Sequence, residues 1–258
     1  MAGTEMSSAF LLEVRKLNKH FGGVVATDQL DLQIAHGEIH ALIGPNGAGK
    51  TTLVAQLAGQ LPSDSGSVYF EGTDITHMVT HLRAQRGLVR SFQITRLFKS
   101  MSVMDNVALA IQASLGQVFS VWWPVKQDAD VRERAMAILA RLSLADKHNW
   151  RIEQLSHGEQ RALEVGMALA GRPKLVLLDE PLAGMGLQES EAMTQLIDSL
   201  RRDFSVLLIE HDVEAVFRLA DTVSVLVNGR IVASGKPADV RANPAVTAAY
   251  LGATGDVQ

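Results

Sequence analysis

Hydrophobic and polar residues alternate along the first third of the chain. Leu30, Leu32 and Ile34 are separated by polar residues, a pattern typical of a strand with one buried face. A short apolar run at 68–70 lies between two glycines and predicts another strand. We therefore expect the N-terminal part of the chain to be rich in β-structure.

A third predicted strand, at 39–43, is followed by a glycine-rich turn and then by a helix-favouring stretch from Lys50 to about Leu61. Strand, loop and helix in this order are what a phosphate-binding loop requires, because the helix then begins at the loop and points its free N–H groups toward the ligand.

The middle of the chain, from about residue 87 to 167, has helical periodicity instead. Apolar residues recur at helical spacing at Val131, Ala135, Leu139 and Leu142. Pro124 follows Trp122 and Trp123, and we expect it to separate two helices. The segment is interpreted as a helical subdomain inserted into a domain that contains the sheet. The tryptophan pair is a candidate contact surface, with packing onto neighbouring helices as an equal alternative.

The last third returns to alternating strands and helices. The apolar runs at 175–178 and 206–209 are typical of parallel strands covered on both faces. A helix between them has one apolar face, formed by Met193, Leu196, Ile197 and Leu200. Asn228-Gly229 separates two more apolar runs and predicts a hairpin with a type I′ turn. A C-terminal tail follows from about residue 236 to 258.

Composition narrows the choice of function. The chain has 258 residues, 47% of them hydrophobic, which fits one α/β domain with a smaller subdomain. Its net charge of -4 argues against a nucleic-acid partner. There is no cysteine, so disulfides and thiolate metal sites are excluded. We expect no secretory signal at the start and no membrane span, since no apolar run approaches the roughly 20 residues required.

One segment matches a phosphate-binding loop completely. Positions 44–51 read G-x-x-x-x-G-K-T, in which small residues let backbone N–H groups surround a phosphate chain. Lys50 is expected to reach the β- and γ-phosphates, and the Thr51 hydroxyl to ligate Mg²⁺. The predicted nucleotide-binding residues of this segment are Gly44, Pro45, Asn46, Gly47, Ala48, Gly49, Lys50, Thr51 and Thr52.

Two further segments carry candidate chemistry. The apolar run at 175–178 ends in Asp179, expected to hold Mg²⁺, and Glu180, expected to polarise an attacking water. Ser156-x-x-Glu159 precedes an apolar run and predicts a capping box at a helix start. Such a helix start also presents N–H groups that can bind a γ-phosphate.

The stretch Leu155-Ser156-His157-Gly158-Glu159-Gln160 resembles the signature sequence of ATP-binding-cassette (ABC) proteins. Other marks of that family follow in order. Gln93 resembles the glutamine that meets Mg²⁺, His211 the histidine that contacts the γ-phosphate, and Phe21 the aromatic residue that stacks on adenine. The resemblance implies an α/β P-loop NTPase fold with an N-terminal antiparallel β subdomain and an inserted helical subdomain.

The resemblance also implies a mechanism. Two cassettes are expected to pair head to tail, so that Ser156, Gly158 and Glu159 of one face the ATP and Mg²⁺ bound by the other, with Glu180, His211 and Lys50 acting in hydrolysis. The implied partners are transmembrane permease subunits, a second cassette and, indirectly, a solute-binding protein, with the chain at the cytoplasmic face of the inner membrane. One departure is Gly186, where the family commonly has an Asp that touches the opposite subunit.

Within the family, the segments 90–98 and 183–185 and the connection around Leu115 to Asp130 look like subunits of branched-chain amino-acid importers. Importers of urea or short amides and lipopolysaccharide exporters are close alternatives. A cassette ATPase acting on DNA or ribosomes is a rival, but such relatives usually carry paired cassettes, zinc-binding cysteines or coiled coils. A small-molecule kinase does not explain the segment 155–160.

Overall fold

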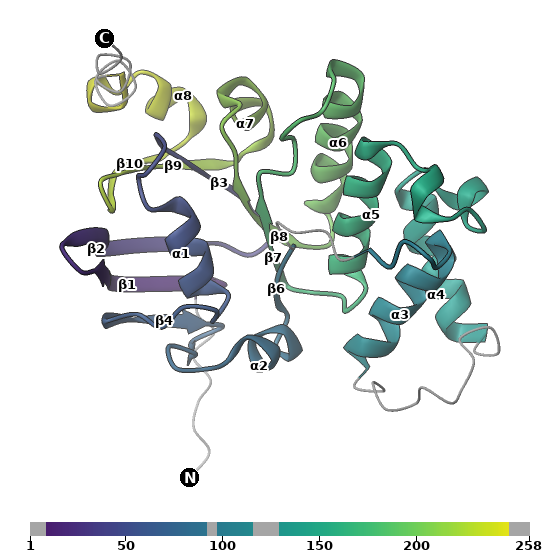
Figure 1. The fold of residues 1–258 in the computed structure, drawn as a ribbon. Helices are drawn as coiled ribbons and strands as arrows, with labels where there is room; N and C mark the ends of the chain where they lie inside the picture. The colour runs from purple at the N-terminus through teal and green to yellow at the C-terminus, as the bar shows by residue number, and fades with distance from the viewer. Residues whose placement is uncertain (1–8, 92–96, 116–128, 248–258) are drawn as a thin grey trace.

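The computed structural model describes residues 9–91, 97–115 and 129–247, which form two sheets with helices around them (Figure 1). The smaller sheet is antiparallel, with the strand order β2-β1-β4-β5. Its strands are β1 (Leu12–Phe21), β2 (Val24–Ile34), β4 (Ser65–Phe70) and β5 (Thr73–Asp74). The predicted β-rich N-terminal part is therefore confirmed.

The larger sheet has the strand order β10-β9-β3-β8-β7-β6. All neighbouring pairs are parallel except β10 with β9. The adjacent strands β3, β8 and β7 are completely buried, and for β7 and β8 the continuous apolar runs predict this. The strands are β3 (Ile39–Ile43), β6 (Leu88–Arg90), β7 (Leu175–Asp179), β8 (Ser205–Ile209), β9 (Thr222–Val227) and β10 (Arg230–Gly235).

The helical part of the chain lies on the far side of the large sheet from β1 and β2 (Figure 1). There α3 (Val103–Ser114) packs against α4 (Ala129–Arg141) and α5 (His157–Leu169). The remaining helices are α1 (Lys50–Leu57), α2 (Thr80–Gln85), α6 (Leu187–Leu200), α7 (Val213–Leu219) and α8 (Pro237–Arg241), with 3₁₀ turns at Ala145–Lys147 and Ile152–Gln154.

Two boundaries differ from the sequence prediction. The stretch predicted to be helical from residue 87 begins with β6, which pairs with β7 in the large sheet. Helix α1 ends at Leu57 rather than near Leu61, because Gly59 adopts a left-handed conformation with φ +72. The buried guanidinium of Arg83 donates to the carbonyls of Gln56 and Leu57 at 2.9 and 2.7 Å and so caps this helix end.

The hairpin and helix predictions of the last third are confirmed. Asn228 and Gly229 both have positive φ, 48 and 78, as a type I′ turn requires. The predicted apolar face of α6 is buried. Pro124 and the pair Trp122 and Trp123 lie outside the described residues. None of the helices in the described ranges is long and apolar enough to cross a membrane.

Candidate nucleotide-binding site

The phosphate loop connects β3 to α1 and depends on glycine at two points. Gly44 and Gly49 have φ 158 and 107. A Cβ atom at Gly44 would lie 2.1 Å from the carbonyl oxygen of Leu226, and one at Gly49 would lie 2.1 Å from that of Ala26. Any larger residue would therefore push the loop off the strands beneath it.

Lys50 lies inside this loop. Its Nζ donates to the carbonyl oxygens of Gly44 and Pro45 at 2.7 and 3.0 Å. Burial lowers the pKa of Lys50, while the charges of Glu180 and Asp179 act in the opposite direction. The ammonium group is thus buried, close to two carboxylates, and bonded to groups that a phosphate can replace.

The other predicted loop residues differ in exposure. Asn46, Gly47 and Thr51 are exposed, Thr52 is half-buried, and Ala48 is packed in the core. The hydroxyl of Thr51, on the first turn of α1, is therefore on an accessible surface.

Asp179 ends β7 with its side chain almost fully buried, and its partner is a residue that the sequence did not single out. Arg90, at the end of β6, donates from Nη2 to Asp179 Oδ2 at 2.6 Å, and the exposed fractions of the two side chains are 9% and 1%. A second nitrogen of Arg90 donates to Gln60, just beyond α1. Its buried Nε has no partner among the described residues.

The residues present fit a Mg²⁺ ion by their chemistry. A carboxylate at Asp179 and a hydroxyl at Thr51 are the hard oxygen donors that Mg²⁺ prefers, and such an ion would polarise the phosphates. Gln93, the third predicted ligand, lies outside the described residues.

Glu180 and His211 meet across the ends of β7 and β8. Glu180 Oε1 lies 2.6 Å from His211 Nε2, and both side chains are partly open to solvent. The backbone of Glu180 is left-handed, with φ 50, a conformation that costs of order 1–3 kcal/mol for a residue other than glycine. Strain of this kind is concentrated at functional positions. The pair is suited to hold and orient a water molecule.

Two residues that the sequence analysis missed hold this arrangement in place. Glu210 is buried, and its carboxylate accepts from the N–H groups of Leu182 and His211 at 2.7 and 3.1 Å. Burial raises the pKa of Glu210. Arg161, on α5, donates to the carbonyl oxygens of Asp179 and Glu180 at 3.3 and 3.1 Å. A single helix therefore connects the signature segment to the hydrolytic residues.

The signature segment begins α5 with the predicted capping box. Ser156 Oγ accepts from the N–H of Glu159 at 3.2 Å, and Glu159 Oε2 accepts from the N–H of Ser156 at 3.0 Å. Ser156 is exposed. The N–H of Gly158 is not free, since it donates to the carboxylate of Glu189. No hydrogen bond between described residues joins this segment to the chain's own phosphate loop.

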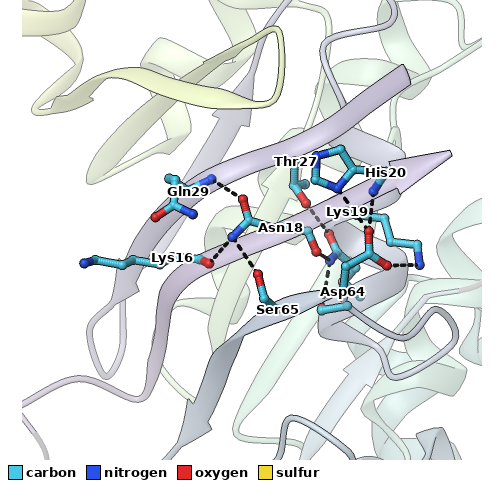
Figure 2. A network of polar contacts seen from close by, with 10 residues as sticks. Lys16, Asn18, Lys19, His20, Thr27, Gln29, Asp64 and Ser65 are labelled. Atoms are coloured by element: carbon cyan, nitrogen blue, oxygen red, sulfur yellow. Dashed lines mark hydrogen bonds and ion pairs between the residues drawn. The ribbon is translucent and has the colours of Figure 1, made fainter. Parts of the chain in front are cut away.

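Phe21 lies at the end of β1 with 49% of its surface exposed, so it is not a core residue. The strand leading to it is held by the polar network in Figure 2. There, Asp64 accepts from Lys19 Nζ at 2.7 Å and from the N–H of His20 at 2.6 Å. Lys19 Nζ in turn lies 5.6 Å from the centre of the Phe21 ring.

The same network reaches helix α1. Asn18 bonds to Ser65 and to the N–H of Gln29, while Thr27 donates to Gln56 on α1 (Figure 2). Hydrogen bonds thus connect the strand that carries Phe21 to helix α1, which follows the phosphate loop.

Gly186 provides the first residue before α6 and makes no side-chain cap. No atom lies within 4 Å of the position that a Cβ would take, so an Asp would fit there sterically. A groove of ≈ 820 Å³ bordered by Glu13, His36 and Arg201 contains none of the predicted site residues.

The chain is similar to known transport proteins over most of its length. Residues 27–183, more than half of the chain, match the ABC transporter family, and residues 230–256 match the family described as branched-chain amino acid ATP-binding cassette transporter. The chain is 35% identical to the probable branched-chain amino acid transport ATP-binding protein LivG of Archaeoglobus fulgidus, with 94% of this chain and 96% of that protein covered. It is 34% identical to LivG of Escherichia coli K12, with 94% and 98% covered.

Solved structures agree with these relatives. The ADP conformation of an ATP-binding cassette from an ABC transporter has a TM-score of 0.83 against this chain at 31% identity, with 94% of this chain and 99% of that chain covered. A nucleotide-free cassette has a TM-score of 0.82 at 30% identity, with 93% and 98% covered. The fold and site are those of a P-loop ATPase built as a cassette. The chain belongs to the ABC transporter family, whose cassettes bind and hydrolyse ATP.

Proposed function

We propose that this cassette powers an importer of branched-chain or other hydrophobic amino acids. The observation that carries the proposal is the agreement between its relatives and its C-terminal segment. The curated relatives are named as branched-chain amino acid transport proteins over nearly the whole chain, and residues 230–256 match a family of the same description. Importers of urea or short amides and lipopolysaccharide exporters are the alternatives.

Each of the site residues is assigned a role in ATP binding or hydrolysis. Lys50 and the loop N–H groups bind the β- and γ-phosphates, Phe21 stacks on adenine, and Glu180 orients and accepts a proton from the attacking water, with His211 holding its carboxylate. Thr51, Asp179 and Gln93 would hold Mg²⁺, which would supply positive charge to the phosphates. Ser156, Gly158 and Glu159 complete the site of a second cassette.

The proposal includes three kinds of partner. Transmembrane permease subunits hold the cassette at the cytoplasmic face of the membrane, a second and different cassette supplies the other half of each site, and a solute-binding protein delivers the solute. Gly186 is compatible with a partner cassette whose own loop provides the missing carboxylate. No nucleic acid is involved, in keeping with the acidic chain.

Purification from native membranes through a tag on this chain tests the proposal. We expect a polytopic membrane protein and a second cassette to co-purify, and the complex in liposomes to accumulate labelled leucine when its solute-binding protein and ATP are supplied. Uptake of urea with no uptake of leucine would reassign the solute. A complex with two copies of this chain and no other cassette would contradict the heterodimer alone.

A further inference from the structure

A carboxylate of the chain already occupies the donors of the signature helix. Glu189, on the first turn of α6, turns its side chain toward the start of α5. Its Oε1 accepts from Ser156 Oγ at 3.1 Å and from the N–H of Gly158 at 3.2 Å. One anionic oxygen therefore satisfies both a side-chain donor and a backbone donor of the helix start.

This contact depends on glycine at position 158. A Cβ atom there would lie 2.7 Å from both Cδ and Oε1 of Glu189, closer than real Cβ contacts allow. The hydrogen bonds from Ser156 and from Gly158 lower the pKa of Glu189, so the group is anionic at neutral pH. The partial positive charge of the helix N-terminus favours the same arrangement.

The γ-phosphate of a partner's ATP is, like the Glu189 carboxylate, an anion with oxygen acceptors. The proposed function assigns this phosphate to the same two donors. A carboxylate oxygen and a γ-phosphate oxygen of a second cassette cannot both accept from Ser156 Oγ and Gly158 N–H at close range. We propose that Glu189 is a positioning residue that holds these two donors while the cassette is alone and must release them before the partner's ATP can bind. This inference rests on the head-to-tail pairing under the proposed function.

The surroundings give the carboxylate room to leave. Ser156 is exposed and Glu189 is partly exposed. A groove of ≈ 420 Å³ between α5 and α6 runs beside Glu189 and is bordered by Ala162, Leu196 and Ser199. Release thus requires a side-chain rotation on α6 and no change in the fold.

ATP-driven association of the purified chain tests the proposal. In a Glu180→Gln background, which retains ATP, dimer formation is followed by analytical ultracentrifugation, with the chain alone and mixed with the cassette that co-purifies. Glu189→Ala should shift association to about tenfold lower protein concentration or more, the factor expected when even one of the two charge-assisted hydrogen bonds no longer competes. Glu189→Gln should fall between, because an amide oxygen is a weaker acceptor than a carboxylate.

Two controls separate this role from a structural one. The ATP affinity of the single cassette should stay unchanged, since the chain's own phosphate loop is not involved. Glu191→Ala, on the same helix and bonded only to Arg218 and Gln195 among the described residues, should leave association as it was. Equal ATP-driven association in all variants, or weaker association of Glu189→Ala, would overturn the role of Glu189 alone. Absence of ATP-driven association in every variant would contradict the head-to-tail pairing and the inference with it.

Discussion

Arg90 and Asp179 form a buried ion pair beside the proposed Mg²⁺ position, and this pair links three parts of the site. Arg90 ends the strand that leads to Gln93, contacts Gln60 beyond α1, and neutralises the carboxylate at the end of β7. A buried charge without its partner is costly, because the surroundings cannot solvate it.

Replacing Arg90 with Met should therefore lower the free energy of unfolding by about 3–5 kcal/mol, the range for breaking a buried pair by removing one partner. Chemical denaturation measures this. Arg218→Met, which removes an exposed pair with Glu191, should change stability by no more than about 0.5 kcal/mol. Combining Arg90→Met with Asp179→Asn should restore part of the loss, and equal effects of the two single Arg variants would refute the assigned role of Arg90.

Phe21, unlike the buried Arg90, is an exposed residue of the site. Because its ring is half exposed, Phe21→Ala should alter stability little, yet weaken ATP binding by about 1–2 kcal/mol through loss of base stacking. Calorimetric titration with ATP measures the affinity. Val24→Ala, an exposed change on the neighbouring strand, serves as the control. Unchanged affinity of the Phe21 variant would remove the residue from the adenine site.

The residues that the sequence revealed are those marked by local spacing. Lys50, Asp179, Glu180 and Ser156 stand in motifs whose chemistry follows from neighbours along the chain. Arg90, Arg161, Glu189 and Glu210 carry no such mark, because each acts through a partner far away in the sequence. Contacts of that kind depend on how the elements pack and could not be predicted from periodicity.

At the scale of elements, the strands and helices follow their apolar patterns closely, since burial of one or both faces determines them. The end of α1 does not follow this pattern, because residues 58–61 contain no proline that would mark the end of a helix. A left-handed Gly59 and the guanidinium of Arg83 end the helix there. Strand β6 is equally hard to predict, because its three residues pair with β7 only through the tertiary fold.

The end of β1 offers a test at this scale. Hydrogen bonds from Lys19 and from the N–H of His20 lower the pKa of Asp64 from 3.8 to about 2. Since the folded pKa lies below the unfolded one, the contribution of Asp64 to stability is fully present above the unfolded value and is lost as pH falls toward about 2.

Asp64→Asn should therefore be less stable than the parent at neutral pH, and the difference should shrink as the pH is lowered below the ordinary pKa of an Asp. Denaturation of both proteins over this range, as far down as the parent stays folded, gives the difference directly. A difference that stays constant or widens on acidification would mean that Asp64 does not act as a charged anchor for the strand that carries Phe21.

At the scale of the whole molecule, the phosphate loop and the signature segment lie on separate parts of the chain, and no hydrogen bond between described residues joins the two. The phosphate loop, Asp179 and Glu180 line the ends of the large sheet, while Ser156 begins a helix joined to that sheet through Arg161. This division fits a site completed by a second cassette. Closure of the pair would then reach the membrane partner through α3 and α4, the helical part on the far side of the sheet from β1 and β2 (Figure 1).

The central claim, that Glu180 drives ATP hydrolysis at this site, is tested most directly by the turnover of Glu180→Gln. The amide cannot accept a proton from water, so phosphate release should fall by about 100-fold or more while ATP binding remains at the level of the parent protein. Glu214→Gln, an exposed change on α7, should retain full turnover. Near-normal hydrolysis by the purified Glu180→Gln protein, with its fold intact, would contradict the account.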